Sequence, residues 1–222
     1  MNEESDKRRD KNKMKMLLRS LSRNETSIVG NKTIVKDIEE YENSDELLSS
    51  RETVMEYLDV LDRLHLIENQ EAYSENYRSS ERVGKSPKRH LTDPSLACAC
   101  LGLTSDKLLK DLKTFGFMFE ALVERDLRIY MDYLNGHLYH FRDNISGLEV
   151  DSILEFPGGD YAAVEIKLGF NGVEEGTANL LKFYDNMVKK PKFMCIIVGK
   201  CNSILRDPKT GIYIVPITAL KP

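Results

Sequence analysis

The sequence predicts a mixed α/β fold preceded by a small, mainly helical domain. Strand patterns at residues 147–156 and 160–168 are joined by a Pro-Gly-Gly turn, which is typical of a hairpin. A helical pattern at 177–189 then leads to an apolar strand pattern at 193–198. A helix that crosses between strands of one sheet indicates an α/β domain. Three stretches with helical spacing come before all of these strands.

Those three stretches predict the helical domain. Apolar residues recur at helical spacing over residues 14–22, 33–41 and 51–67, and Ser49 or Ser50 is the expected cap of the third helix. The polar stretch that runs on to Lys88 could fold back as a wing. Three helices and a wing indicate a winged-helix domain over residues 14–84. Residues 1–13 are almost all polar or charged, and we expect a disordered tail.

Charge is distributed in blocks. Residues 1–36 have a net charge of +5 and residues 37–81 a net charge of −11, although the whole chain has only −4. The acidic residues include four on the outward positions of the third helix: Glu52, Glu56, Asp59 and Asp62. A winged helix would present this helix to a major groove, but phosphates would be repelled from it. Charge therefore favours docking of a protein over direct DNA reading by this helix.

The second domain is predicted to span residues 85–222. It opens with three cations, Lys85, Lys88 and Arg89, in a stretch that is either a nucleic-acid contact or a solvated hinge. A short strand at residues 89–91, a helix at 95–101, a second at 106–113, a long helix from about 115 and a strand at 137–142 are expected next. A last strand is expected at 212–217.

Four charged residues in this domain are the candidate catalytic group. On the long helix, Glu120 shares a face with the apolar residues Phe117, Val123 and Leu127, where a carboxylate is unusual. Strand alternation places Asp151 on the face opposite that of Leu148, Val150, Leu154 and Phe156. On the next strand Glu165 and Lys167 share one face, and Val164, Ile166 and Leu168 take the other.

Cleavage of a phosphodiester explains why such residues would lie together. The reaction needs a nucleophilic water and neutralisation of the phosphoryl charge, and hard cations held by carboxylates supply both. Asp151 and Glu165 are the expected ligands of Mg²⁺ or Mn²⁺, with Glu120 approaching from the helix. Lys167 would orient the water or stabilise the transition state.

These residues resemble a known family. The order helix, strand, strand with Asp, strand with Glu-x-Lys, helix, strand is similar to the PD-(D/E)xK, or restriction-endonuclease-like, fold. The segments SPKRHLTDPSLACACLG, FGFMFEALVERDLRIY, HFRDNISGLEVDSI, AAVEIKLG and GIYIVPITAL resemble the uncharacterised C-terminal domain of a prokaryotic family of AAA-type ATP-binding proteins. The preceding part resembles the winged-helix segment that follows the ATPase core in that family.

The resemblance implies DNA or an ATPase domain as partner and a nuclease-like activity, with two departures. Val150 stands where the nuclease signature has Pro, and no G-x-x-x-x-G-K-[ST] phosphate loop occurs in the sequence. The chain is therefore not expected to be an ATPase on its own. It looks like the C-terminal two domains without the motor: a truncated product, a fragment or a stand-alone descendant. A catalytically inert docking or structural module is the alternative to an enzyme.

Cysteine usage and hydropathy bear on the compartment. The four cysteines, Cys98, Cys100, Cys195 and Cys201, lack C-x-x-C spacing and are expected to be reduced. No stretch approaches 18 uncharged apolar residues, and no signal-peptide pattern opens the chain. We expect a cytoplasmic protein that makes no membrane contact.

Overall fold

The computed structural model describes residues 11–41, 51–76, 78–79 and 85–221. Within them, α1 (Lys11–Arg23), α2 (Asn31–Tyr41) and α3 (Arg51–Arg63) precede β1 (Ile67–Ala72) and β2 (Lys88–Leu91). Three helices follow: α5 (Pro94–Leu101), α6 (Ser105–Lys110) and α7 (Leu112–Tyr133). The three predicted N-terminal helices are confirmed, but the third ends at Arg63 because Ile67 already belongs to β1. Its predicted caps lie outside the described residues.

The remaining elements follow the predicted order. They are β3 (His137–Arg142), β4 (Glu149–Glu155), β5 (Tyr161–Lys167), η1 (Phe170–Gly172), α8 (Val173–Asn186), β6 (Phe193–Val198), β7 (Leu205–Arg206), β8 (Tyr213–Pro216) and η2 (Ile217–Ala219). Gly158 and Gly159 both have positive φ, which confirms the predicted turn between β4 and β5. The two-residue strand β7 was not predicted, since it is too short to show a pattern.

The described strands form one mixed sheet in the order β2-β1-β3-β4-β5-β6-β8-β7, so the predicted α/β class is confirmed. β3, β4 and β5 are antiparallel neighbours, and α8 carries the chain across to β6, which is parallel to β5. β1 and β2 pair as an antiparallel hairpin, but β1 also pairs parallel with β3. The strands expected to form a wing are therefore continuous with the main sheet.

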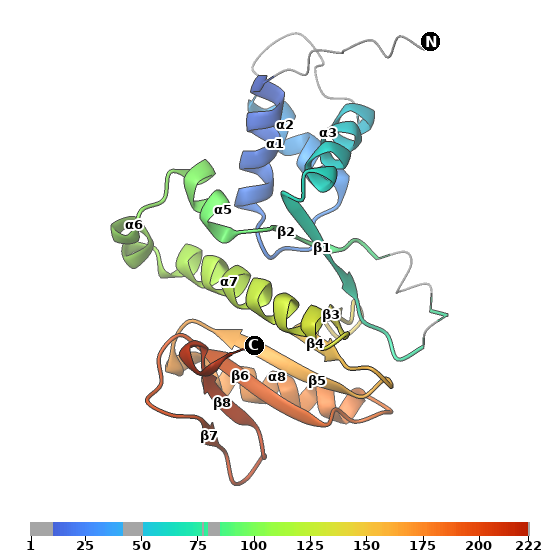
Figure 1. Cartoon of the computed structure of the whole chain (residues 1–222), viewed down its shortest axis with the longest axis vertical. Coiled ribbons are helices and arrows are strands. Elements are labelled where there is room, and N and C mark those ends of the chain that lie inside the picture. The colour runs from blue at the N-terminus through green and yellow to red at the C-terminus, as the bar shows by residue number, and fades with distance from the viewer. Residues whose placement is uncertain (1–10, 42–50, 77, 80–84, 222) are drawn as a thin grey trace.

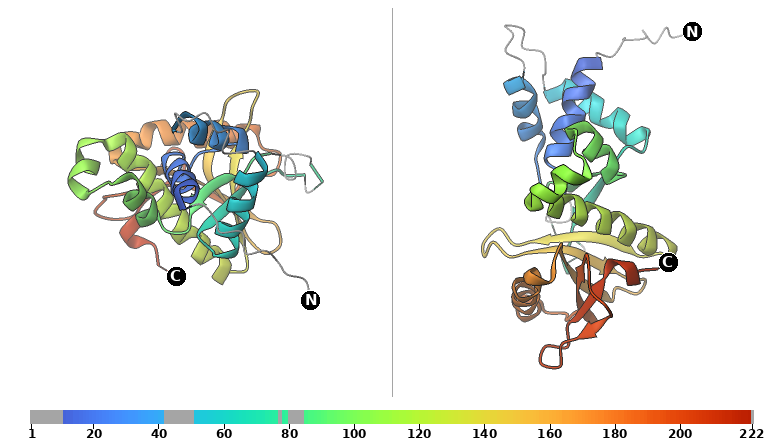
Figure 2. Two further views of the ribbon diagram at one scale, coloured as in Figure 1. Left: turned by 90° about the horizontal axis from the view of Figure 1, so that it is seen from above. Right: turned by 90° about the vertical axis from the view of Figure 1, so that its left-hand side faces the viewer.

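Helices cover both faces of this sheet. Figure 1 shows α1, α2 and α3 at one end of the molecule, with α7 between them and the strands β4 to β8. The side view in Figure 2 shows α7 on one side of β3 and β4 and α8 on the other. Val123 and Leu127 of α7 pack on Val164 and Ile166, and Phe183 of α8 packs in a separate cluster with Val150 and Ile153. A third cluster joins α1, α2 and α3 to β1, β2, α5 and the start of α7.

One predicted alternation is wrong because β4 contains a β-bulge. Tyr139 pairs with Ile153 and Phe141 with Val150, so the single residue His140 faces Asp151 and Ser152 together. The extra residue reverses the side-chain directions of the strand beyond it. Val150 therefore packs on the α8 side and Leu154 on the α7 side, as does Phe156, although all were expected on one face.

The described residues contain no helix that is long and apolar enough to cross a membrane.

Two glycines near α7 give a matched test of its packing. An alanine Cβ at Gly136 would lie 2.7 Å from the Glu155 carbonyl oxygen, and one at Gly116, inside α7, would meet nothing within 4 Å. We expect Gly136→Ala to lower the free energy of unfolding by about 1–3 kcal/mol through overpacking. Gly116→Ala should raise it by about 0.5–1 kcal/mol, since alanine is the better helix former. Urea denaturation of the two variants checks both signs.

Candidate functional site

Asp151 lies where β4 and β5 separate. The last pair between these strands is Ser152 with Val164, whereas β5 remains paired to β6 as far as Lys167. The backbone N–H of Ile166 donates to the Asp151 carboxylate at 2.7 Å. One carboxylate oxygen of Asp151 thus accepts the β5 backbone N–H that lacks a β4 partner at this fork between the two strands. The β-bulge in β4 places Asp151 there.

Glu165 and Lys167 lie on the other side of this fork. The Lys167 ammonium is 2.9 Å from one Glu165 oxygen, and the second oxygen, Oε1, is buried without a hydrogen-bond partner. Glu165 is only 1% exposed. Both side chains lie under α8, where a Cβ on Gly176 would meet Glu165 at 3.5 Å and Lys167 at 3.5 Å. Their predicted common face is confirmed.

The four candidate residues influence one another electrostatically. Burial raises the pKa of Glu165 to about 8, and the charge of Asp151 adds to this effect. Burial likewise raises the pKa of Glu120 to about 7, where Asp151 raises it further and Lys167 opposes it. Burial opposes the charge of Lys167, but the carboxylates of Glu165 and Asp151 outweigh it and raise the pKa. Glu120 thus responds to the charges of Asp151 and Lys167, although it lies on α7, whereas Glu165 and Lys167 lie under α8 on the other side of the sheet.

Glu120 has a partner that was not expected. The Lys88 ammonium forms an ion pair with Glu120 and a second one, at 2.7 Å, with Glu124 one turn further along α7. Lys88 is 5% exposed and paired with two carboxylates, so neither predicted role, a nucleic-acid contact or a solvated hinge, holds at this position. Arg89 is half-buried and donates to Val29 O and Asn31 Oδ1, and Lys85 donates to the carbonyl of Arg142.

Lys88 holds its charge because the two carboxylates are close. Burial alone would lower the pKa of Lys88, but Glu120 and Glu124 outweigh burial and raise it above the ordinary value. Burial raises the pKa of Glu124 to about 7. The sequence did not point to Glu124, because a charged position one turn from Glu120 is unremarkable on a long helix.

Further buried polar residues extend the cluster towards the N-terminal helices. His90 lies 3.5 Å from Glu124, 3.0 Å from Gln70 and 3.3 Å from Glu25, whose carboxylate accepts the backbone N–H of Leu91. Ser152 in the bulge donates to Glu124 at 3.2 Å. The cluster therefore contains five carboxylates, those of Glu25, Glu120, Glu124, Asp151 and Glu165. Against these the described part of the cluster has three cations, the ammonium groups of Lys88 and Lys167 and the guanidinium of Arg128, which acts on Glu25.

This imbalance predicts a pH-dependent stability. Burial raises the pKa of Glu25 to about 8, so between pH 6.5 and 8 the folded protein retains a proton that the unfolded chain has released. The free energy of unfolding should therefore fall as pH rises through this window, by at least about 1 kcal/mol. His90, whose pKa burial lowers to about 4, acts with the opposite sign, but only below pH 6.5.

Urea denaturation at several pH values checks this expectation. Glu25→Gln should reduce the slope of the free energy of unfolding against pH between pH 6.5 and 8, and should leave the slope outside this window unchanged. A wild-type stability that is flat or rises across the window would contradict the assignment.

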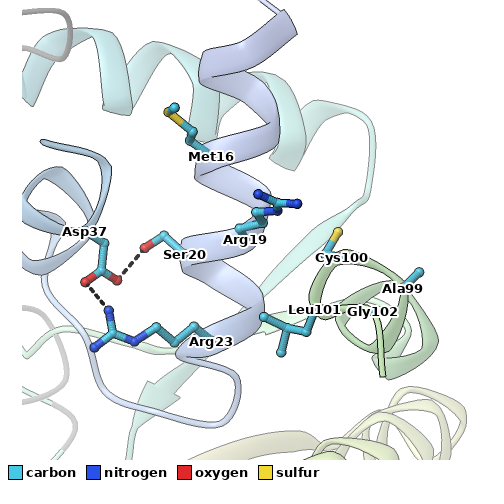
Figure 3. A pocket seen from close by; sticks show the side chains of 9 residues that line it. All are labelled: Met16, Arg19, Ser20, Arg23, Asp37, Ala99, Cys100, Leu101 and Gly102. Carbon is cyan, nitrogen blue, oxygen red and sulfur yellow. Dashed lines mark hydrogen bonds and ion pairs between the residues drawn. The ribbon is translucent and has the colours of Figure 1, made fainter. Parts of the chain in front are cut away.

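A cavity of about 260 Å³ opens on the cluster. Lys88, Glu120 and Asp151 line it together with residues from the loop after α1 and from β3 and β4. A larger pocket of about 400 Å³ lies elsewhere, between α1 and α5 (Figure 3). Its Arg23 and Ser20 are both bonded to Asp37 at 2.8 Å, and it contains no member of the carboxylate cluster.

A divalent cation fits part of this arrangement. Oxygen atoms of carboxylates are its preferred ligands, and Asp151 and Glu165 offer two such groups with one buried oxygen still unbonded. Glu120 is instead bound by Lys88. In the described part of the chain, no three Asp, Glu, His or Cys side chains converge as a metal site.

Family comparison divides the chain into two parts. Residues 115–220 match a domain of unknown function, DUF4143. This domain is found in AAA-ATPase-associated proteins. Residues 3–107 match a second domain of unknown function, DUF8612. The residues of the cluster come from both matched regions, since Glu25, Lys88 and His90 belong to the first and Glu120, Asp151 and Glu165 to the second.

No curated protein matches the chain. One solved structure, a refined half-complex from a tetradecameric assembly of Thermococcus gammatolerans McrB AAA+ hexamers with bound McrC, is 11% identical in sequence. The match covers 90% of this chain and 70% of that one, with a TM-score of 0.30. At this TM-score the likeness carries no argument about fold or function.

Proposed function

We propose that the chain is a divalent-cation-dependent phosphodiesterase that acts on DNA. The observation that carries the proposal is that the Asp151 carboxylate accepts the N–H of Ile166, the residue between Glu165 and Lys167, where β4 and β5 separate. The order α7-β3-β4-β5-α8-β6 supports a restriction-endonuclease-like assignment for this part. The helices α1 to α3 with the β1–β2 hairpin support a winged-helix assignment for the remainder.

Each residue of the group has a task in this proposal. Asp151 and Glu165 would hold Mg²⁺ or Mn²⁺, and the ion would supply activation of water and neutralisation of phosphoryl charge. Lys167, 21% exposed at its side chain and next to Glu165, orients the attacking water or stabilises charge in the transition state. Glu120 assists only when its oxygen is free of Lys88, so Lys88 limits its part in the reaction.

DNA is the proposed substrate because of the charge of α1. This helix contains Lys or Arg at five positions and no acidic residue, and four of its cations are exposed and spaced four residues apart. The four are Lys11, Lys15, Arg19 and Arg23, of which Arg23 is paired with Asp37 at 2.8 Å. Such a stripe suits a phosphate backbone and predicts binding that weakens with salt.

Incubation with labelled single- and double-stranded DNA tests the proposal. Cleavage should appear with Mg²⁺ or Mn²⁺ and stop when a chelator is added. DNA left intact by the full chain under both metals, over a range of pH from 6.5 to 9, would contradict a phosphodiesterase.

A catalytically inert module that docks on an ATPase is the second candidate. Two observations favour it: residues 115–220 match a domain found in AAA-ATPase-associated proteins, and the exposed side of α3 is acidic. Charge reversal at Glu56 and Asp59 should abolish co-purification with an ATP-binding protein, and the wild-type chain itself should leave DNA intact. If no ATP-binding protein co-purifies with the wild-type chain, this candidate is contradicted.

A further inference from the structure

The 260 Å³ cavity beside the carboxylate cluster contains polar atoms that have no partner. Thr26 and His140 both line it, and the hydroxyl of Thr26 and both ring nitrogens of His140 are buried without hydrogen bonds. Thr26 is 7% exposed and His140 2% exposed. A buried polar group without a partner costs about 1–3 kcal/mol, so two such side chains facing one cavity indicate a ligand that bonds to them.

The conformation of Thr26 supports this conclusion. Its φ is 59°, in the left-handed region that a β-branched residue rarely adopts. Strain of this kind is found mostly where a side chain must be held in place for binding or catalysis. Thr26 belongs to the loop after α1, and His140 lies on β3 opposite the bulge that contains Asp151. The cavity is therefore closed by two distant parts of the chain.

The charges around the cavity exclude a simple anion. Three carboxylates line it, those of Glu120, Glu149 and Asp151. Its two cations are already paired, Lys88 with Glu120 and Arg142 with Glu149 at 3.1 Å. A phosphate would meet more negative than free positive charge here. A neutral ligand that both donates and accepts hydrogen bonds suits a hydroxyl and a neutral imidazole better.

The apolar part of the lining indicates a flat ligand. Phe117 lines the cavity from α7 and is 41% exposed, although the helical pattern had placed it on the buried face. Ile28, Phe141 and Val150 are the other apolar residues of the lining. An exposed aromatic ring beside buried hydrogen-bonding groups is the usual arrangement for stacking an unpaired base and reading its edge.

We propose that this cavity binds a nucleobase, which stacks on Phe117 and hydrogen-bonds to Thr26 and His140. The inference rests on the proposed function and narrows its substrate to nucleic acid with an unpaired base, such as a single strand or a frayed end.

Binding without cleavage tests the proposal. Fluorescence anisotropy would follow a labelled single-stranded oligonucleotide and the same strand with one abasic position, both in EDTA. Phe117→Ala should weaken binding of the intact strand by roughly five- to 150-fold, since a stacked base contributes about 1–3 kcal/mol. Phe117→Tyr keeps the ring and should bind as wild type does.

The polar contacts have their own matched set. Thr26→Val and His140→Phe should each weaken binding of the intact strand several-fold. Thr26→Ser keeps the hydroxyl and should bind as wild type does. Ser27→Ala is the control: Ser27 lines the same cavity, but its hydroxyl already donates to the Glu25 carbonyl at 3.4 Å. Thr26→Val and His140→Phe should leave binding of the abasic strand unchanged.

The outcomes separate this inference from the proposed function. If the wild-type protein binds the intact strand more tightly than the abasic strand but cleaves neither, the phosphodiesterase proposal alone is overturned. Three outcomes would overturn the nucleobase site alone. Wild type and Phe117→Ala could both cleave and bind the oligonucleotide with equal affinity, the substitutions could weaken binding of the intact and abasic strands equally, or the protein could bind neither strand.

Discussion

Replacement of Lys88 by Met should lower the free energy of unfolding by about 3–5 kcal/mol, because it leaves two buried carboxylates without their cation. Glu120 and Glu124 both bond to this ammonium, and the side chain of Glu124 is fully buried. Protonation of the two acids would relieve part of the cost. The loss should therefore be larger at pH 8 than at pH 6, and urea denaturation followed by circular dichroism at the two pH values measures it.

A triple variant controls for the change of shape. Lys88→Met combined with Glu120→Gln and Glu124→Gln removes all three charges and keeps the volumes, and it should recover most of the lost stability. An unchanged unfolding midpoint for Lys88→Met alone would show that the ion pairs do not stabilise the protein.

Glu165→Gln should reduce metal-dependent cleavage of DNA by more than about a hundredfold. Mutation of groups that only support a metal ligand costs 10–100-fold, and Glu165 is proposed as a direct ligand. The amide has the same shape and can still accept from Lys167, so folding should be retained. Single-turnover cleavage with Mg²⁺ and with Mn²⁺ measures the effect.

Glu149→Gln is the matched control for this prediction. Glu149 lines the neighbouring cavity, but its side chain is 54% exposed and bonded to Arg142. Its replacement should leave cleavage within a few-fold of wild type. Equal rates for Glu165→Gln and wild type would remove Glu165 from the reaction.

The sequence predicted most elements of the fold because their patterns are local. Helical spacing located α1 and α2, alternation located β5, and the apolar run at residues 193–198 coincides with β6. Strand alternation also placed Glu165 and Lys167 on one face, because residues two apart in a regular strand share a face whatever the partner strand is. The pairing of β1 with β3 joins segments about 70 residues apart, and no local pattern reports it.

The candidate site was predicted only in part because two of its features depend on tertiary structure. The bulge opposite His140 changes the face of every later residue in β4, and a regular alternation cannot include it. The burial of Lys88 depends on α7 packing over β2, so a cation in a polar stretch gave no sign of its two carboxylate partners. Likewise the exposure of Phe117 follows from the position of α7 relative to β3 and β4 rather than from helical spacing.

Calorimetric titration of the metal-free protein with Mn²⁺ tests most directly whether Asp151 and Glu165 hold a divalent cation. The account predicts one bound ion for wild type and an affinity at least about tenfold weaker for Asp151→Asn. This variant keeps an oxygen for the Ile166 N–H, so its effect reports the lost charge. Wild-type protein that binds no ion, or Asp151→Asn that binds as tightly as wild type, would contradict it.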